Sequence, residues 1–205
     1  MSQTSESNIP VDNDKLLIGL DGEIQSIAKQ MEIIPWLEKS WGRAKNISAS
    51  FLDQVWKGSN ARVQDLPNSF PYIYISDKEY YSVMPNDTYK AYSFWGVSGQ
   101  SIGKDQANGI NYSKSNFEAP VYLIVWVNLR AIDKTKDYIF TQELIKDVLK
   151  QLRRKSNFTL TQVFDERVED IFKGFSLTPE KRDLLMYPFQ AFRIEGKLNY
   201  ILNLC

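Results

Sequence analysis

Few side chains in this chain could carry out catalysis. Its 205 residues include no histidine, and the one cysteine is the last residue, Cys205. These counts exclude a Ser-His-Asp triad, a Cys-His pair, a histidine-ligated metal and a disulfide framework. Acidic pairs such as Asp165/Glu166 and Glu169/Asp170 could act as general acid and base, but solvated surface faces explain them equally well. From these counts we expect no nucleophilic active site and no metal site, and a carboxylate-based enzyme is the one catalytic class left.

One glycine-containing segment superficially suggests a phosphate-binding loop. It runs from Gly99 through Gly103 to Lys104, with three residues between the glycines where the P-loop has four. Asp105 stands where a serine or threonine would bind magnesium, and no strong strand precedes the segment. We interpret it as a flexible loop.

Basic side chains cluster at one place, where Lys150, Arg153, Arg154 and Lys155 follow the end of a clear helical pattern. Cations are favourable at a helix C-terminus because they interact with the helix dipole, and this interpretation is preferred. The alternative is a patch that faces DNA phosphates, which proteins contact largely through lysine and arginine.

Three tryptophans, Trp36, Trp41 and Trp56, form an aromatic group among polar residues. Such a group could bind a partner or a sugar, but buried aromatic side chains are commoner. We therefore expect these tryptophans in the core or at an interface between subunits. Arg193 and Lys197, on a predicted C-terminal strand, are further candidates for that interface.

Composition and charge place the chain among ordinary globular proteins. Hydrophobic residues make up 43% and charged residues 24%, and 25 Lys and Arg balance 25 Asp and Glu, so a strongly basic nucleic-acid or membrane binder is not indicated. The longest apolar run, 119–127, is far shorter than the roughly 20 residues of a membrane helix. Residues 1–10 lack the features of a signal peptide. We expect a soluble intracellular protein that does not bind membranes.

The N-terminal part predicts an arm followed by a helix. Residues 1–11 are polar and non-periodic, and we expect a flexible arm there, with a single domain over 12–205. Asp12 or Asp14 could cap the helix and Pro35 marks its end. Its apolar stripe repeats at spacings of three and four and consists of Leu17, Leu20, Ile24, Ile27 and Met31.

The next part of the chain is rich in aromatic residues. Residues 36–66 are interpreted as short helical or irregular structure, with a second helix near 50–57. The run 71–76 is β-branched and aromatic and predicts a strand. Residues 83–87 then predict a turn, and 89–97 a returning strand.

The middle of the chain combines a polar segment with strong periodic patterns. Residues 96–119 predict a long inserted loop, a feature that is usually functional or disordered. Residues 121–129 (VYLIVWVNL) predict a central strand buried on both faces. A helix begins at Thr141, with its apolar face formed by Leu144, Ile145, Val148, Leu149 and Leu152.

The C-terminal third is partly ambiguous. Residues 160–175 fit either helix or strand, whereas alternating apolar residues from Phe192 to Leu204, interrupted by Gly196, predict a long strand. Its other face, which carries Arg193, Glu195, Lys197 and Asn199, is expected to be solvated. Together the patterns predict an α+β fold: a mostly antiparallel sheet flanked by helices, with an N-terminal helix and long loops.

A series of short motifs gives the chain a family resemblance. In order they are Trp36-Leu37, Trp41-Gly42-Arg43-Ala44, Pro71-Tyr-Ile-Tyr with Tyr80, Met84-Pro85-Asn86-Asp87, Val121-Tyr-Leu-Ile-Val-Trp126, a helix, Tyr187-Pro188-Phe189 and Phe192-Arg193-Ile194. Over roughly residues 15–205 the chain resembles the tail-completion (tail-terminator) and neck-ring proteins of tailed bacteriophages, especially those of crAss-like gut phages.

The resemblance implies a tail-terminator-like α+β subunit without enzymatic activity or cofactor. Six or twelve copies would form a homo-oligomeric ring in the virion, assembled in the host cytoplasm. The ring would act as a head–tail connector that contacts portal or adaptor and tail proteins. It would surround the DNA channel and touch double-stranded DNA transiently and non-specifically.

Two segments, 36–66 and 96–119, depart from the simplest members of that family, so a tail terminator and another ring of the collar both remain open. Two other classes of function are alternatives. One is a small-molecule or carbohydrate-binding module that uses a Trp- and Tyr-rich surface. The other is a carboxylate-based enzyme such as a glycoside hydrolase.

Overall fold

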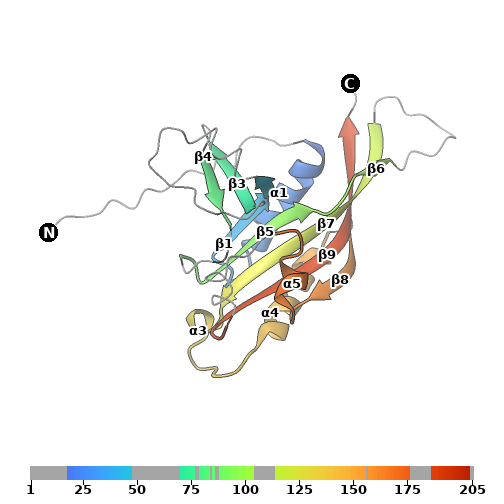
Figure 1. Ribbon diagram of the computed structural model, residues 1–205. Coiled ribbons are helices and arrows are strands. Elements are labelled where there is room, and N and C mark those ends of the chain that lie inside the picture. The colour runs from blue at the N-terminus through green and yellow to red at the C-terminus, as the bar shows by residue number, and fades with distance from the viewer. Residues whose placement is uncertain are drawn as a thin grey trace, which may run out of the picture.

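The computed structural model describes residues 18–47, 70–76, 79–83, 85, 88–103, 114–155, 157–175 and 186–203. The fold is α+β, as the sequence predicts (Figure 1). In chain order the elements are α1 (Gly19–Met31), β1 (Lys39–Arg43), β2 (Lys45–Ile47), β3 (Phe70–Ser76), β4 (Glu79–Ser82), β5 (Ala91–Val97), β6 (Ile102–Gly103), β7 (Lys114–Asn128), α3 (Leu129–Ile132), α4 (Thr141–Leu152), β8 (Phe158–Phe164), α5 (Val168–Ile171) and β9 (Phe189–Asn203).

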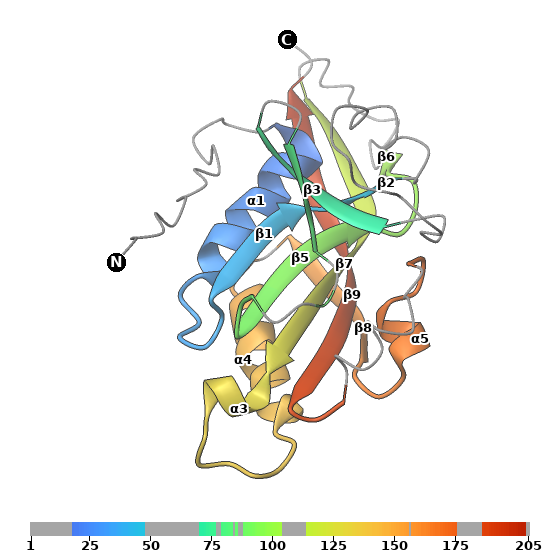
Figure 2. The ribbon, with the colours of Figure 1, turned by 60° about the vertical axis from the view of Figure 1, so that its left-hand side comes forward.

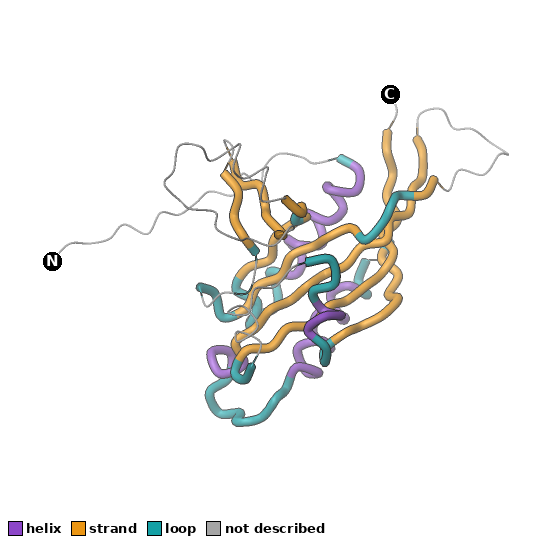
Figure 3. Tube along the Cα trace, in the orientation of Figure 1, coloured by secondary structure: helices purple, strands orange, loops and turns teal. Residues whose placement is uncertain are grey.

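The described strands form a large sheet and a small one. The large sheet has the strand order β1-β5-β7-β9-β8, and β6 also pairs with β7. Its strands pair antiparallel except for β1, which runs parallel to β5. Strands β7 and β9 have 15 residues each and pair along their whole length, so they form the spine of the sheet (Figure 3). The small antiparallel sheet has the order β2-β3-β4.

Helices α1 and α4 lie on one face of the large sheet (Figure 2). Both helices are amphipathic, and apolar burial is the main force that holds such helices on a sheet. The core on this side includes Ile24, Ile27 and Met31 of α1, Leu144, Ile145 and Val148 of α4, and Leu123, Val125, Phe192 and Ile194 of the sheet.

The small sheet and α5 pack against the opposite face. Ile73 of β3, Val83 after β4 and Ile171 of α5 are buried there. A row of aromatic rings crosses the strands beneath them: Trp41 to Tyr92 at 5.2 Å between ring centroids, Tyr92 to Trp126 at 5.4 Å and Trp126 to Phe189 at 5.2 Å. With a core on each side, residues 121–127 of β7 are buried throughout, which confirms the two-face-buried strand predicted from VYLIVWVNL.

Both periodic helices are confirmed. Helix α4 begins at Thr141 and buries most of its predicted apolar face. Helix α1 buries Ile24, Ile27 and Met31 and ends at Met31, before the predicted stop at Pro35. The predicted caps and the 1–11 arm lie outside the described residues.

The helical or irregular interpretation of 36–66 is wrong for the part that is described, because β1 and β2 occupy 39–43 and 45–47. The predicted helix at 50–57 lies outside the described residues. The predicted return of 71–76 to 89–97 is also wrong. Strand β3 pairs with β2 and β4 in the small sheet, whereas β5 pairs with β1 and β7 in the large one.

The loop predicted over 96–119 is narrower than expected, since 96–97, 102–103 and 114–119 belong to strands. Within the segment interpreted as a flexible loop, Ile102 and Gly103 form β6 and pair with β7. Residues 99–101 lie outside the strands, and Lys104 lies outside the described residues. Within 114–119, Phe117 and Ala119 contribute apolar side chains to the core beneath the helices. Phe117 stacks on Tyr200 at 5.4 Å on the helix-covered side, and this pairing extends β7 alongside β9. Residues 104–113 are not described.

Candidate interaction surfaces

The predicted basic cluster lies at the C-terminal end of α4 and in the turn after it. Lys150, Arg153 and Arg154 are exposed and Lys155 is half-buried. Lys150 forms an ion pair with Asp147 at 3.4 Å within the same helix. The position of the cluster at a helix C-terminus agrees with a favourable interaction with the helix dipole. Because Lys150, Arg153 and Arg154 are exposed, these three cations are also accessible at the surface.

Polar contacts join this end of α4 to α1. Lys155 Nζ donates to Ser26 Oγ at 2.9 Å, and Gln30 Nε2 donates to the carbonyl oxygen of Gln151 at 3.3 Å. These contacts place the end of α4, with its basic cluster, beside α1.

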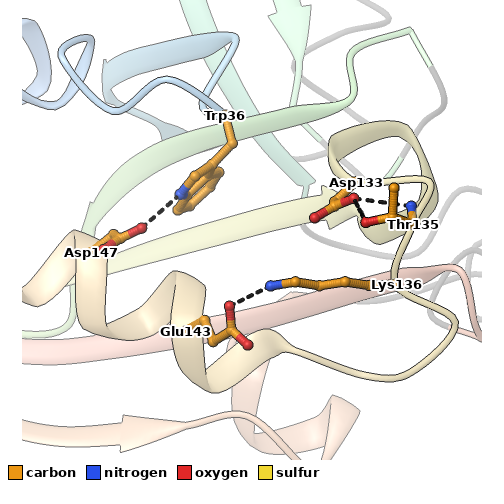
Figure 4. Close-up of polar contacts among 6 residues, drawn as sticks. All are labelled: Trp36, Asp133, Thr135, Lys136, Glu143 and Asp147. Carbon is orange, nitrogen blue, oxygen red and sulfur yellow. Dashed lines mark hydrogen bonds and ion pairs between the residues drawn. The ribbon is translucent and has the colours of Figure 1, made fainter.

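The described tryptophans of the predicted interface group are buried in their own chain. Trp36 is 9% exposed and Trp41 is 7% exposed. The Trp36 indole donates to Asp147 Oδ2 at 3.3 Å and so ties the segment after α1 to α4 (Figure 4). Trp41 packs edge-on against Tyr89 at 5.6 Å. This burial removes both side chains from the predicted subunit interface, and Trp56 lies outside the described residues.

Arg193 is also buried, at 2% exposure, so the prediction that its face of the C-terminal strand is solvated is wrong at this residue. The reason is tertiary: α5 and the residues after it cover this stretch of β9. The guanidinium stacks on the Tyr122 ring at 3.8 Å from its centroid. It also donates to Glu195 Oε1 at 2.8 Å and to the carbonyl oxygen of Lys173 at 3.0 Å. Arg193 therefore joins β7 and the residues after α5 to β9 inside the chain, and it is not an interface residue.

Lys197, the last of the predicted interface residues, remains at the surface. Its side chain is 54% exposed and forms an ion pair with Glu118 of β7 at 3.1 Å. Among the described members of that predicted group, Lys197 alone is accessible to a partner.

Burial raises the pKa of the Tyr122 hydroxyl above its ordinary value, and the charge of Arg193 offsets part of this rise. The unfolded chain therefore releases this proton at lower pH than the folded protein. It follows that the contribution of Tyr122 to stability is complete below the unfolded pKa, near 10, and is lost as pH rises through the folded pKa.

We expect Tyr122→Phe to flatten the fall in the free energy of unfolding above about pH 10, where the unfolded tyrosine ionises. Urea unfolding of the wild type and the variant at a series of alkaline pH values measures this difference. Tyr138→Phe, at a position 53% exposed, is the control. Equal slopes for wild type and Tyr122→Phe would contradict the expectation.

Exposed apolar side chains, which sequence reasoning did not single out, gather at both ends of the large sheet. We name them the α3-end group and the β6-end group. The α3-end group, between 47% and 68% exposed, consists of Tyr138, Ile139, Met186 and Tyr187. The β6-end group, between 52% and 71% exposed, consists of Ile18, Ile102 and Ile201.

Pairing places the two groups at opposite ends. Met186 and Tyr187 precede the start of β9, which pairs with the end of β7 just before α3, whereas Ile201 pairs near the start of β7 (Figure 1). Exposed apolar patches mark interaction sites more often than single exposed residues do.

Local polar contacts order the loop that carries Tyr138 and Ile139. Asp133 accepts hydrogen bonds from the hydroxyl and the backbone N–H of Thr135, and these bonds hold the pKa of Asp133 below its ordinary value. Lys136 forms an ion pair with Glu143 at 2.5 Å, and this hydrogen bond raises the pKa of Lys136 (Figure 4). These contacts hold the loop that carries Tyr138 and Ile139 in a defined conformation.

The carboxylates considered as general acid and base, Asp165, Glu166, Glu169 and Asp170, follow β8 and enter α5. Asp165 accepts a hydrogen bond from Gln142 at the start of α4. Within the ranges that the structure describes, no three His, Cys, Asp or Glu side chains are grouped to hold a metal ion.

Residues 160–175, which fit either helix or strand in the sequence, contain both. Strand β8 ends at Phe164, and the short helix α5 follows at Val168–Ile171. Strand β8 lies at one edge of the large sheet, and Thr159 to Gln162 are exposed. The β-branched residues of 159–164 are the sequence signal for this strand, and the competing helical spacing obscures it. Its place at the edge of the sheet has no local signal.

The described helices are each too short or too polar to cross a membrane. No known protein family matches this chain, and no curated protein matches it in sequence.

Proposed function

We propose that this chain is a structural, non-catalytic subunit of a ring at the neck or tail of a tailed phage, where it joins the portal to the tail and surrounds the DNA channel. Copies of the chain, portal or adaptor proteins and tail proteins are its partners in this proposal. Tail terminator and another collar ring are equally compatible with it.

The observation that carries the proposal is the pair of unlike apolar groups at opposite ends of one sheet. Head-to-tail contacts that close into a ring need two different complementary patches on each subunit. The α3-end group and the β6-end group are unlike in composition, since one is rich in tyrosine and methionine and the other is made of isoleucine, and in this proposal they supply the two patches.

The charge distribution also supports the proposal. The chain has equal numbers of cationic and anionic side chains, and its exposed basic cluster at the end of α4 is small. A strongly basic lumen would retain DNA through its phosphates, whereas a small patch allows transient contact with DNA that moves through the ring.

The carbohydrate-binding alternative is weaker, because Trp36 and Trp41 are packed inside the chain and offer no stacking surface for a sugar. That alternative is left with Trp56, outside the described residues, and with the exposed rings of Tyr138 and Tyr187. It predicts a ligand-dependent rise in melting temperature of a monomer.

The test is mass photometry of the purified protein, alone and mixed with the portal complex of the same phage. We expect either a closed ring or stoichiometric capture by the portal. The double variant Tyr138→Ser/Ile139→Ser should reduce this assembly by about tenfold or more, because it removes two exposed apolar contacts.

The matched control for that variant changes two exposed polar residues of the same loop, Lys134→Ser/Asp137→Ser, and should assemble like the wild type. A wild-type protein that neither closes into a ring nor binds the portal would overturn the proposal.

A further inference from the structure

Strand β8 is an open edge of the large sheet. Among the described strands it pairs with β9 only, and Leu160 in its middle is 40% exposed. An edge strand presents unpaired backbone N–H and C=O groups, which can pair with a strand of another chain.

The outward backbone groups of β8 can be assigned from its contacts with β9. The Asn157 carbonyl accepts from the backbone N–H of Asn199, and the Thr159 carbonyl lies against Gly196. Because successive residues of a strand face opposite sides, the N–H and C=O groups of Phe158 and Leu160 point away from β9. The Phe158 N–H is already engaged, because it donates to the carbonyl oxygen of Lys155 at 3.4 Å. The Phe158 carbonyl and the N–H and C=O groups of Leu160 are the groups that face the free edge.

The sequence of β8 (FTLTQVF) carries no charge and no proline, the usual devices that keep edge strands apart. A bulge between Leu160 and Gln162 is its one irregularity of register with β9. The opposite edge, β1, is protected: it is shorter, it carries Lys39 and Arg43 at its ends, and Arg43 is paired with Asp21 of α1 at 3.1 Å. Of the two edge strands of the large sheet, β8 is therefore the one that can more easily pair with a strand of another chain.

Opposite charges flank β8. Before it come Arg153, Arg154 and Lys155, with no acidic residue between them and the strand. After it come four carboxylates, Asp165, Glu166, Glu169 and Asp170, with Arg167 as the one cation among them. On each side at least two of these charges are exposed.

We propose that β8 is a docking edge for β8 of a second copy of this chain, which pairs with it in antiparallel orientation. A two-fold axis then passes near the middle of the strand. In this orientation the basic start of each β8 lies beside the acidic end of the other, whereas a parallel pairing would place cations beside cations. The large sheet continues through both copies.

A second copy suits this edge better than an unrelated strand, because it supplies the complementary order of charges by symmetry alone. The contact goes beyond the proposed ring, whose head-to-tail contacts use the two ends of the sheet. It concerns pairs of free subunits and does not depend on the portal.

The test is analytical ultracentrifugation of the full chain at low salt, where a concentration-dependent dimer is expected. Arg153→Glu/Arg154→Glu should weaken the dimer by about tenfold or more, since like charges then meet at both symmetric ends. Glu166→Lys/Glu169→Lys should do the same. All four positions are exposed, so the fold is kept.

The decisive variant combines the four substitutions, which restores opposite charges and should return the dimer to near wild-type strength. Lys134→Glu, an exposed reversal in the α3–α4 loop, is the control and should leave the dimer unchanged. Higher salt should weaken the wild-type dimer because the facing charges are at the surface.

A cysteine at the strand centre tests the geometry independently of charge. Thr161→Cys, in a Cys205→Ser background, should form a disulfide between copies under mild oxidation, while Lys134→Cys in the same background should not. A monomer at every concentration, or a combined charge variant as weak as its two parents, would overturn the contact. A portal-bound ring from a protein that is monomeric alone would overturn this contact and leave the proposed function standing.

Discussion

Replacing Glu195 with glutamine is expected to lower the free energy of unfolding by about 3 kcal/mol, because removal of one partner leaves the other charge buried and unpaired. The Arg193 side chain is 2% exposed, and Nε and Nη2 both bind Glu195 Oε1, at 2.8 and 2.7 Å. Glutamine keeps the shape and one acceptor oxygen but not the charge. Urea unfolding followed by tryptophan fluorescence measures the loss.

The same argument makes the effects of Arg193 and Glu195 strongly non-additive. Adding Arg193→Met to Glu195→Gln removes the buried charge together with its partner, so most of the lost stability should return. Recovery should be incomplete, because the hydrogen bond to the Lys173 carbonyl and the stacking on Tyr122 are also lost. A double variant less stable than Glu195→Gln would contradict this account.

A neighbouring ion pair, which joins Lys197 of β9 to Glu118 of β7, provides the control. Glu118→Gln removes the partner of Lys197, which is 54% exposed and returns to water. The expected cost is below about 1 kcal/mol, as for exposed ion pairs in general. If Glu195→Gln costs no more than Glu118→Gln, Arg193 is not held by a buried ion pair.

The sequence predicted the elements whose periodicity is long and whose burial is uniform along the element. The core stripe of α1, helix α4 and the strands β7 and β9 have one or two continuous apolar faces, and each is confirmed. Strands β1 and β2 are five and three residues long. Windows this short carry no usable period, and the partners of these strands are distant in sequence.

The sequence predicts a loop at 114–119 for a related reason. The segment KSNFEA is mostly polar, and its apolar contribution to the helix-covered face is limited to Phe117 and Ala119. The extension of β7 depends on its partner β9, which lies about 80 residues away along the chain. No local pattern contains that information.

The candidate site residues also divide into those whose position follows from a local sequence pattern and those whose environment depends on tertiary contacts. The position of the basic cluster at the end of a helix followed from the helical period and is confirmed. The burial of Arg193 could not be foreseen, because α5 covers it through a tertiary contact, and strand alternation placed it with solvated neighbours. The open edge of β8 depends on strand order in the sheet, which periodicity does not reveal.

Gly196 interrupts the apolar alternation of β9. We expect Gly196→Ala to destabilise the protein by about 2–3 kcal/mol, in the upper part of the roughly 1–3 kcal/mol that overpacking of a close-packed interior costs. A Cβ atom at this position would lie 2.4 Å from Phe158 Cζ and 2.6 Å from the Thr159 carbonyl oxygen. The Phe158 ring therefore occupies the space above the glycine, and β8 can approach β9 at Gly196 because no side chain intervenes. Thermal or urea unfolding of the variant measures the effect.

Gly42→Ala in β1 is the matched control, because a Cβ atom there meets nothing within 4 Å, and it should be neutral or slightly stabilising. The second variant that separates the two contacts is Gly196→Ala/Phe158→Leu. A smaller, flexible side chain relieves the contact with the ring, but the backbone oxygen of Thr159 stays in place, so the double variant should recover part of the loss and not all of it. Full recovery would assign the effect to the ring alone. A Gly196→Ala protein as stable as Gly42→Ala would mean that β8 can move away from β9 at little cost, and that the edge strand is held less rigidly than the contacts of Asn157 with Asn199 and Glu23 imply.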